Sequence, residues 1–230
     1  SSSFACTLPG PVDLVICDHV GWFGFDYHII PMLEDARHRL LRPSGQVMPR
    51  RITLHAAGIS GDGCAALVDR WGQPPVPPEF AWLREYEVNT KHPFEANADD
   101  LCTAPAVLGD IDLTQDSPPH LAFTASLTAT RAAIFRGIAG WFACELADGI
   151  WMSNSPLGPE PLGRNQVFLA AREPFAVQAG EEIGLTLRFS KQGDMIAWTF
   201  NPPGGQPRQK LSTFNALPLG AAELRRGAGC

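Results

Sequence analysis

The sequence lacks a basic excess, a long apolar run and a secretory leader. Lys and Arg number 18 against 24 Asp and Glu, for a formal net charge of −6, whereas a nucleic-acid binder usually carries a clustered basic face. No segment approaches the roughly 20 apolar residues that a membrane-spanning helix needs. Residues 1–6 have neither the charged nor the apolar region of a signal peptide. We therefore expect a soluble, cytoplasmic protein that binds neither nucleic acid nor a membrane.

Paired cysteines are also missing. The six cysteines are scattered, with no Cys-x-x-Cys pair and no histidine at zinc-ligand spacing. We expect them to be small buried hydrophobic residues in a reducing compartment, and we expect no metal site. They are Cys6, Cys17, Cys64, Cys102, Cys144 and Cys230.

The first 49 residues have the pattern of an α/β unit. The nearly continuous apolar run at residues 12–17 predicts a parallel strand buried on both faces. Apolar residues at helical spacing predict a helix over residues 31–42, ended by residues 43–45 and followed by a brief strand at 46–48. This order indicates the C-terminal remnant of a Rossmann-like α/β domain, with a border near Pro49.

Residues 50–230 have the pattern of a β domain. Short runs with period-two alternation are separated by turn residues, which is typical of a closed or sandwiched antiparallel sheet. We predict a mainly β chain in which an antiparallel β-barrel follows the strand-helix-strand remnant. The expected strands are 51–59, 121–128, 134–146, 150–152, 165–171, 183–190 and 195–200.

Two segments interrupt this pattern. Residues 73–105 begin with prolines at positions 74, 75, 77 and 78, followed by an amphipathic stretch at 79–88 and then a polar stretch. A loop this long inside a compact domain is usually functional or covers a partner, so we expect an interaction arm, with a disordered surface excursion as the alternative. Residues 58–63 are glycine-rich but are not followed by a credible helix of a βαβ unit, so we expect a turn there and predict no nucleotide-binding loop.

Several motifs resemble the protein arginine methyltransferase family in order and spacing. The N-terminal match covers that family's double-glutamate loop and the last stretch before its barrel, in Cys17-Asp18-His19-Val20-Gly21-Trp22 and Arg42-Pro43-Ser44-Gly45-Gln46-Val47-Met48-Pro49. Its barrel is similar to segments 140–142, 151–156, 165–169 and 177–181. The resemblance implies an S-adenosylmethionine-dependent methyltransferase whose cofactor domain lies upstream of Ser1. This chain alone should then bind the cofactor poorly and be inactive.

The resemblance also implies site residues. In the family two glutamates grip the acceptor guanidinium, because a planar fork of donors pairs with carboxylates. Asp18 matches the first glutamate, and the second falls on Tyr27, with Asp26 immediately before it. The family's threonine-histidine-tryptophan loop aligns with residues 161–163, so its histidine is missing here. His19 is a candidate general base beside Asp18, or a histidine that packs on the aromatic loop.

The aromatic residues of the same loop also have two interpretations. Trp22, Phe23, Phe25 and Tyr27 either line an acceptor pocket or belong to the core. Since tyrosine adds no second negative charge at neutral pH, three functions stay open. They are an arginine methyltransferase-like enzyme, a methyltransferase for a hydroxyl, amine or small molecule, and a catalytically degenerate barrel that binds a protein or ligand. In the family an arm docks on the partner's cofactor domain, which implies a homodimer through residues 73–105.

Overall fold

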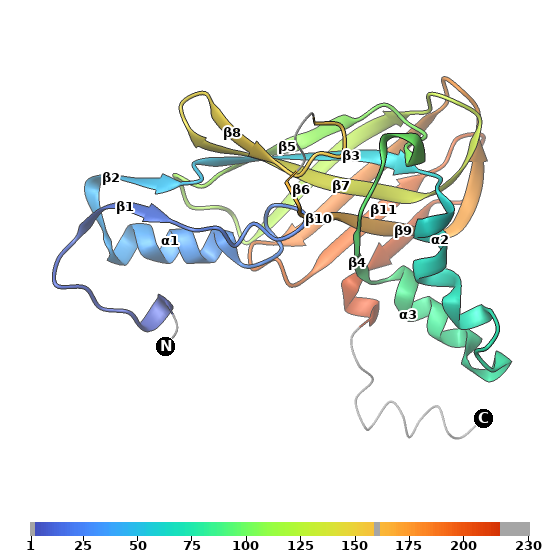
Figure 1. Cartoon of the computed structure of the whole chain (residues 1–230), viewed down its shortest axis with the longest axis horizontal. Coiled ribbons are helices and arrows are strands. Elements are labelled where there is room, and N and C mark those ends of the chain that lie inside the picture. Colours follow the sequence, from blue (N-terminus) through green and yellow to red (C-terminus); the bar gives the residue numbers. More distant parts are fainter. Residues whose placement is uncertain (1–2, 159–161, 217–230) are drawn as a thin grey trace.

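The computed structural model describes residues 3–158 and 162–216, and over these residues the protein is mainly β (Figure 1). Most strands belong to two antiparallel sheets, one of six strands and one of four, and two more strands form a separate parallel pair. The predicted mainly β class is confirmed, whereas closure of the sheets into a barrel stays a prediction. No helix in these ranges is long and apolar enough to cross a membrane.

The N-terminal unit consists of β1 (Val12–Ile16), α1 (Ile29–Arg39) and β2 (Leu41–Met48). β1 and β2 pair in parallel and α1 connects them, so the predicted order of strand, helix and strand is confirmed. The predicted burial of the first strand on both faces is wrong for the described residues, because no residue of β1 is buried. The unit shares one hydrophobic core with the sheets. Its status as the remnant of a separate domain, residues 1–49, stays a prediction.

The end of α1 differs from the sequence-based expectation. The sequence predicts a helix that reaches Arg42 and is ended by residues 43–45, but α1 ends at Arg39 and residues 41–48 form β2. Arg42 precedes Pro43, and the proline ring disfavours helical backbone at the residue before it. The chain therefore becomes extended early, and the pairing of β2 with β1 is irregular around these residues.

The six-stranded sheet has the order β4-β9-β7-β3-β5, with β8 paired to β7. Its longest strand, β7, pairs with β3 on one side and β9 on the other. A hairpin joins β7 to β8 and places Gly149 at a φ of 74°, which glycine adopts without steric cost. The strands are β3 (Arg51–Ile59), β4 (Lys91–Phe94), β5 (Ala106–Asp112), β7 (Ala133–Ala147), β8 (Ile150–Ser153) and β9 (Gln166–Val177).

The four-stranded sheet has the order β12-β11-β10-β6. Its strands are β6 (His120–Thr128), β10 (Glu182–Ser190), β11 (Ile196–Asn201) and β12 (Gln209–Ser212). Leu127 is buried while its neighbours Ser126 and Thr128 are exposed, which confirms the period-two pattern predicted for this strand.

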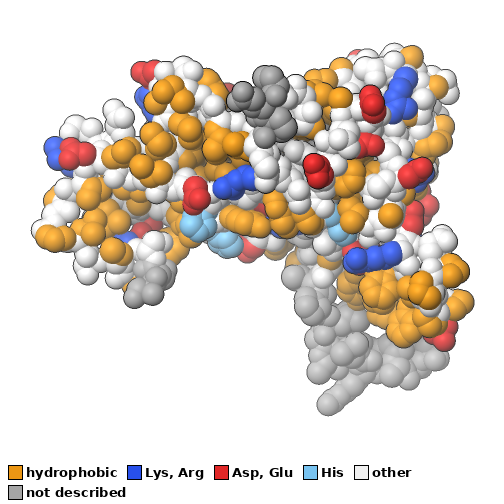
Figure 2. All heavy atoms as spheres, in the orientation of Figure 1, with side chains coloured by type: hydrophobic (Ala, Val, Ile, Leu, Met, Phe, Trp, Pro, Cys, Tyr) orange, Lys and Arg blue, Asp and Glu red, His pale blue; other side chains and the backbone are white. Residues whose placement is uncertain are grey.

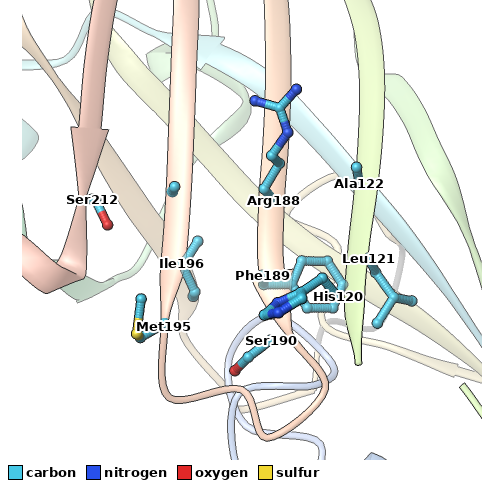
Figure 3. Close-up of a pocket in the computed structure, with 10 residues that line it drawn as sticks. His120, Leu121, Ala122, Arg188, Phe189, Ser190, Met195, Ile196 and Ser212 are labelled. Carbon is cyan, nitrogen blue, oxygen red and sulfur yellow. The ribbon is translucent and has the colours of Figure 1, made fainter. Parts of the chain in front are cut away.

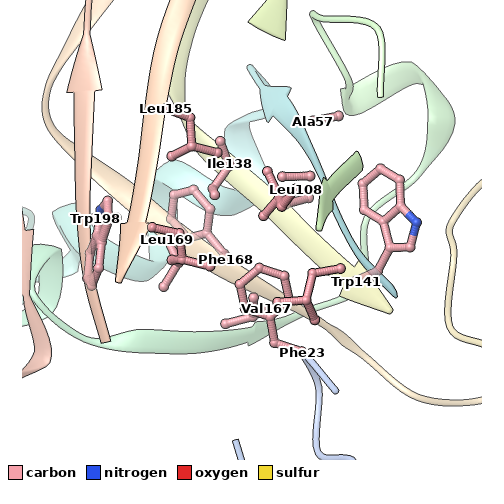
Figure 4. Close-up of a cluster of buried hydrophobic side chains, with 14 of the residues drawn as sticks. Phe23, Ala57, Leu108, Ile138, Trp141, Val167, Phe168, Leu169, Leu185 and Trp198 are labelled. Carbon is pink, nitrogen blue, oxygen red and sulfur yellow. The ribbon is translucent and has the colours of Figure 1, made fainter. Parts of the chain in front are cut away.

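Aromatic side chains fill the core between the sheets (Figure 4). The indole nitrogen of Trp198 in β11 donates a hydrogen bond to the carbonyl of Ala170 in β9 at 2.8 Å, which ties one sheet to the other. Phe25, from the loop after β1, stacks on Phe189 of β10 with ring centroids 3.7 Å apart. The N-terminal loop is therefore held by the same core as the sheets.

A helical arm, residues 62–88, projects from one end of the sheets (Figure 1). It contains α2 (Asp62–Asp69), η2 (Arg70–Gly72), η3 (Pro78–Leu83) and α3 (Arg84–Val88). The segment predicted as an interaction arm, residues 73–105, has regular structure, and its strand β4 is an edge strand paired with β9. The alternative of a disordered surface excursion therefore does not describe these residues.

Residues 58–63 do not form the predicted turn as a whole, because β3 ends at Ile59 and α2 begins at Asp62. This helix has only eight residues, and packing of the buried Cys64 and Val68 stabilises it. The strand before this helix, β3, has antiparallel neighbours on both sides. No parallel strand-helix-strand unit therefore surrounds these glycines.

The cysteines only partly follow the prediction of buried thiols. Cys64, Cys102 and Cys144 are buried, and burial raises their pKa values to about 12, 11 and 12. Cys6 is exposed and Cys17 is half-buried, so the prediction is wrong for Cys6. Cys230 lies outside the described residues.

Candidate functional site

The loop between β1 and α1 alternates buried and accessible side chains. Phe23 and Phe25 are fully buried, whereas Trp22 and Tyr27 are partly accessible. The Phe23 amide donates to Asp26 Oδ1 at 2.9 Å, which closes the loop on itself. The aromatic loop is therefore both core and pocket lining: its two phenylalanines belong to the core, and its other two rings face outward.

A buried asparagine fixes this loop to the sheets. Asn154 is fully buried, and its Nδ2 donates to the carbonyls of Trp22 at 2.9 Å and Asn165 at 2.8 Å. Its Oδ1 accepts the Phe142 amide at 2.9 Å, and its own carbonyl accepts Gln166 Nε2 at 2.6 Å. No local sequence pattern predicts this network, because its members become neighbours only in the folded chain.

A hollow of about 220 Å³ opens beside the aromatic loop. Trp22 and Tyr27 form one wall, with edge-to-face rings whose centroids lie 5.8 Å apart. Residues 163–165, just before β9, form the opposite wall, and Gly21 completes the lining. A second hollow of about 290 Å³ shares residues 163–165 and extends toward Glu95 and Asn97.

Asp18 and His19 come together near this opposite wall. His19 Nδ1 lies 3.6 Å from Asp18 Oδ1, and Arg164 Nη2 lies 4.0 Å from Asp18 Oδ2. The Asp18 side chain is 82% exposed, so its carboxylate is available to an incoming group. His19 Nδ1 also lies 3.7 Å from the Cys17 sulfur, whose pKa is raised by burial. This arrangement can orient an acceptor and take a proton from it.

Asp26 has different surroundings from Asp18. Its side chain is 0% exposed, and Oδ2 lies 3.2 Å from Lys91 Nζ, which also donates to the Asp26 carbonyl at 3.2 Å. The same ammonium lies 5.9 Å from the Trp22 ring centroid and 5.8 Å from that of Tyr27. The Lys91 ammonium, from β4, therefore contacts the Asp26 carboxylate and lies near the Tyr27 ring.

Sequence reasoning missed Lys91, because no local pattern marks it. Lys91 is the first of only three lysines in the sequence, and it lies next to the histidine and proline of a short edge strand. Of the loop that aligns with the family histidine, Pro161 lies outside the described residues, while Gly163 lines both hollows. Within the described ranges no three His, Cys, Asp or Glu side chains are grouped as metal ligands.

A third hollow, of about 300 Å³, lies on the four-stranded sheet and away from these residues (Figure 3). Arg188 of β10 and His120 of β6 contribute its polar groups, and Met195 and Ile196 contribute apolar surface. None of its lining residues comes from the loop between β1 and α1. The motifs found in the sequence therefore point to the hollow beside Trp22 and Tyr27.

The chain is similar to known methyltransferases in sequence and in fold. No protein-family model matches the sequence. An arginine N(omega)-methyltransferase of Streptomyces achromogenes subsp. streptozoticus is 27% identical over 187 residues, 80% of this chain, and this chain spans about half (50%) of the length of that relative. Two solved structures superpose on most of the chain. The Trypanosoma brucei PRMT1 enzyme-prozyme heterotetrameric complex with AdoHcy gives a TM-score of 0.74 at 15% identity, covering 89% of this chain and 70% of that one.

The second is Arabidopsis thaliana protein arginine methyltransferase 10 in an open conformation, with a TM-score of 0.70 at 17% identity, covering 92% of this chain and 73% of that one. The chain has a protein arginine methyltransferase-like fold.

In this methyltransferase-like fold, the described residues do not supply a site that fits S-adenosylmethionine. A nucleotide-type cofactor needs a glycine turn between a parallel strand and a helix, and the glycines at residues 58–63 follow an antiparallel strand.

Proposed function

We propose that this chain supplies the acceptor-side loop and the β domain of an S-adenosylmethionine-dependent methyltransferase of the arginine methyltransferase-like type. The observation that carries the proposal is the position of Asp18. The loop after β1 holds this exposed carboxylate 4.0 Å from Arg164, which lines an aromatic hollow. Methyl transfer is an in-line displacement, so positioning the acceptor is the main task of such a site.

The exposed surface of β1 supports a cofactor domain that precedes this chain. Leu14 is 44% and Ile16 is 66% exposed, although parallel strands are normally covered on both faces. Within the described residues β1 pairs only with β2. An apolar strand with one paired edge fits an α/β domain that continues on its other side.

Calorimetry tests this proposal. The full-length parent protein, titrated with S-adenosylmethionine and S-adenosylhomocysteine, should give saturable heat for both. Mass spectrometry after incubation with candidate acceptors should then detect one added methyl group on the acceptor. Absence of heat with either cofactor would contradict the proposal.

A second candidate function is a binding module that has lost methyl transfer. The observation in its favour is the neutral Tyr27 beside an Asp26 that is already paired with Lys91. A binding module of this kind gives no heat with either cofactor, so the same titration separates the two functions.

We also propose a homodimer through the helical arm. Phe80 and Trp82 in η3 are 44% and 55% exposed, and apolar side chains gather over the arm in Figure 2. Exposed large apolar side chains that lie together are typical of a protein-protein contact.

A further inference from the structure

A corner beside the hollow is built to hold a cation. The Trp22 and Tyr27 rings meet edge to face, and the carboxylate of Asp26, from the same loop, is buried. Aromatic faces attract cations through their quadrupole, and a buried carboxylate attracts them more strongly. A ligand cation entering the hollow would seek this corner.

Lys91 already occupies that corner. Its ammonium lies 3.2 Å from Asp26 Oδ2 and within 6 Å of both ring centroids, at 5.9 and 5.8 Å. Its backbone is fixed because β4 pairs with β9, Lys91 opposite Leu169. Withdrawal of the ammonium would leave the Asp26 carboxylate buried without a partner, which is strongly unfavourable. Lys91 therefore stays in place when a ligand arrives.

The other charges around the hollow do not reverse this effect. Arg164 lines it directly, and the carboxylate that pairs with Arg164, Asp18, is largely exposed and also lies near His19. A guanidinium or ammonium ligand would meet Lys91 and Arg164 at short range, and like charges repel there. An uncharged planar group can stack on the aromatic wall without this repulsion.

We propose that Lys91 is a specificity determinant that closes the hollow to cationic acceptors, so that the group bound there is uncharged and planar, such as a carboxamide, phenol or indole. This inference rests on the proposed function for its biological meaning. Its test is independent of that function, because it requires neither cofactor nor turnover.

Benzamide and benzamidinium provide a matched pair of probes, since they share size and planarity and differ in charge. Binding to the full chain is measured by NMR titration of the Trp22 indole signal, assigned with Trp22→Phe. We expect benzamide to bind at least tenfold tighter than benzamidinium. Equal affinities, or no binding of either probe, would overturn the proposal.

Two variants then test the role of Lys91. In Lys91→Met, benzamidinium should gain at least tenfold in affinity, while the control Lys210→Met in β12 should leave both affinities unchanged. The double variant Lys91→Met with Asp26→Asn removes both charges and keeps the buried pair's approximate shape, so it tests the proposal if the single variant does not fold. In the double variant the tenfold preference for benzamide should fall at least threefold, and an unchanged preference in a folded variant would refute the role of Lys91.

Discussion

Asp18 and Asp26 lie in the same loop, but the fold gives them opposite surroundings. Asp18 is 82% exposed beside His19, whereas the Asp26 side chain is 0% exposed and held by Lys91 and the Phe23 amide. A carboxylate that orients an acceptor must be accessible to it. Of the two acids suggested by the resemblance, Asp18 is therefore the one suited to contact substrate, and Asp26 positions the loop.

The first prediction concerns this residue. Asp18→Asn in the full-length protein should lower turnover about 100-fold or more, the scale typical of a positioning or proton-transferring group. The rate of methyl transfer at saturating acceptor is the measurement. Asp13→Asn is the control, because Asp13 is also exposed and ion-paired, with Arg42 at 2.5 Å, but lies in β1 rather than in the loop. Equal turnover in the two variants would remove Asp18 from the site.

At the scale of elements, the sequence predicts what is periodic and misses what depends on context. The alternation of β6 was sufficient, because one buried face requires period two. The apolar run of β1 predicted a strand correctly but not its burial, because Leu14 and Ile16 are exposed within the described residues. β4 was missed because it contains Pro93, and proline is tolerated only on an edge strand. Its edge position is a property of the sheet, which no local pattern reveals.

The same limit applies to the candidate site. Asp18, His19, Asp26 and Tyr27 were found because they are close in sequence and lie within a recognisable motif. Lys91 reaches the site from 65 residues away, and neither end of such a contact carries a local signature. Sequence reasoning therefore found one wall of the hollow and left the other wall and its cation unknown.

The second prediction concerns the helical arm. Burial alone raises the pKa of Glu87, but hydrogen bonds from Arg70 and Trp71 outweigh it and hold this pKa below its ordinary value of 4.5. A carboxyl with a lowered pKa in the folded state contributes stability above its unfolded pKa and loses that contribution as the pH falls through the folded value. The arm should therefore lose stability below about pH 4.5.

Thermal unfolding followed from pH 7 to pH 3 checks this expectation. Glu87→Gln should show a smaller fall in melting temperature over that range than the unsubstituted chain, because the ionisable group is gone. The exposed Glu79 of η3 gives a matched control, Glu79→Gln. An unchanged pH profile in Glu87→Gln would show that the arm's acid sensitivity has another source.

At the scale of the whole molecule, the helical arm leaves apolar side chains without cover. If the arm joins two copies, Trp82→Glu should convert the dimer into a monomer, because a charge buried in an apolar contact is costly. Light scattering coupled to size exclusion measures this directly. Trp151→Glu is the control, because Trp151 is 45% exposed and its strand, β8, lies away from the arm in Figure 1. A dimer that survives the Trp82 substitution would place the contact elsewhere.

The asparagine that fastens the aromatic loop has a consequence for biosynthesis. Asn154 bonds to the Trp22 carbonyl across 132 residues, and its other partners in β7 and just before β9 must also be in place. The loop leaves the ribosome well before Asn154, and it lacks this anchor until the chain has been made as far as β9. Contacts of such long range form late, because the intervening chain must first be ordered. A nascent chain halted before β9 would therefore leave the aromatic loop without this anchor and accessible to chaperones.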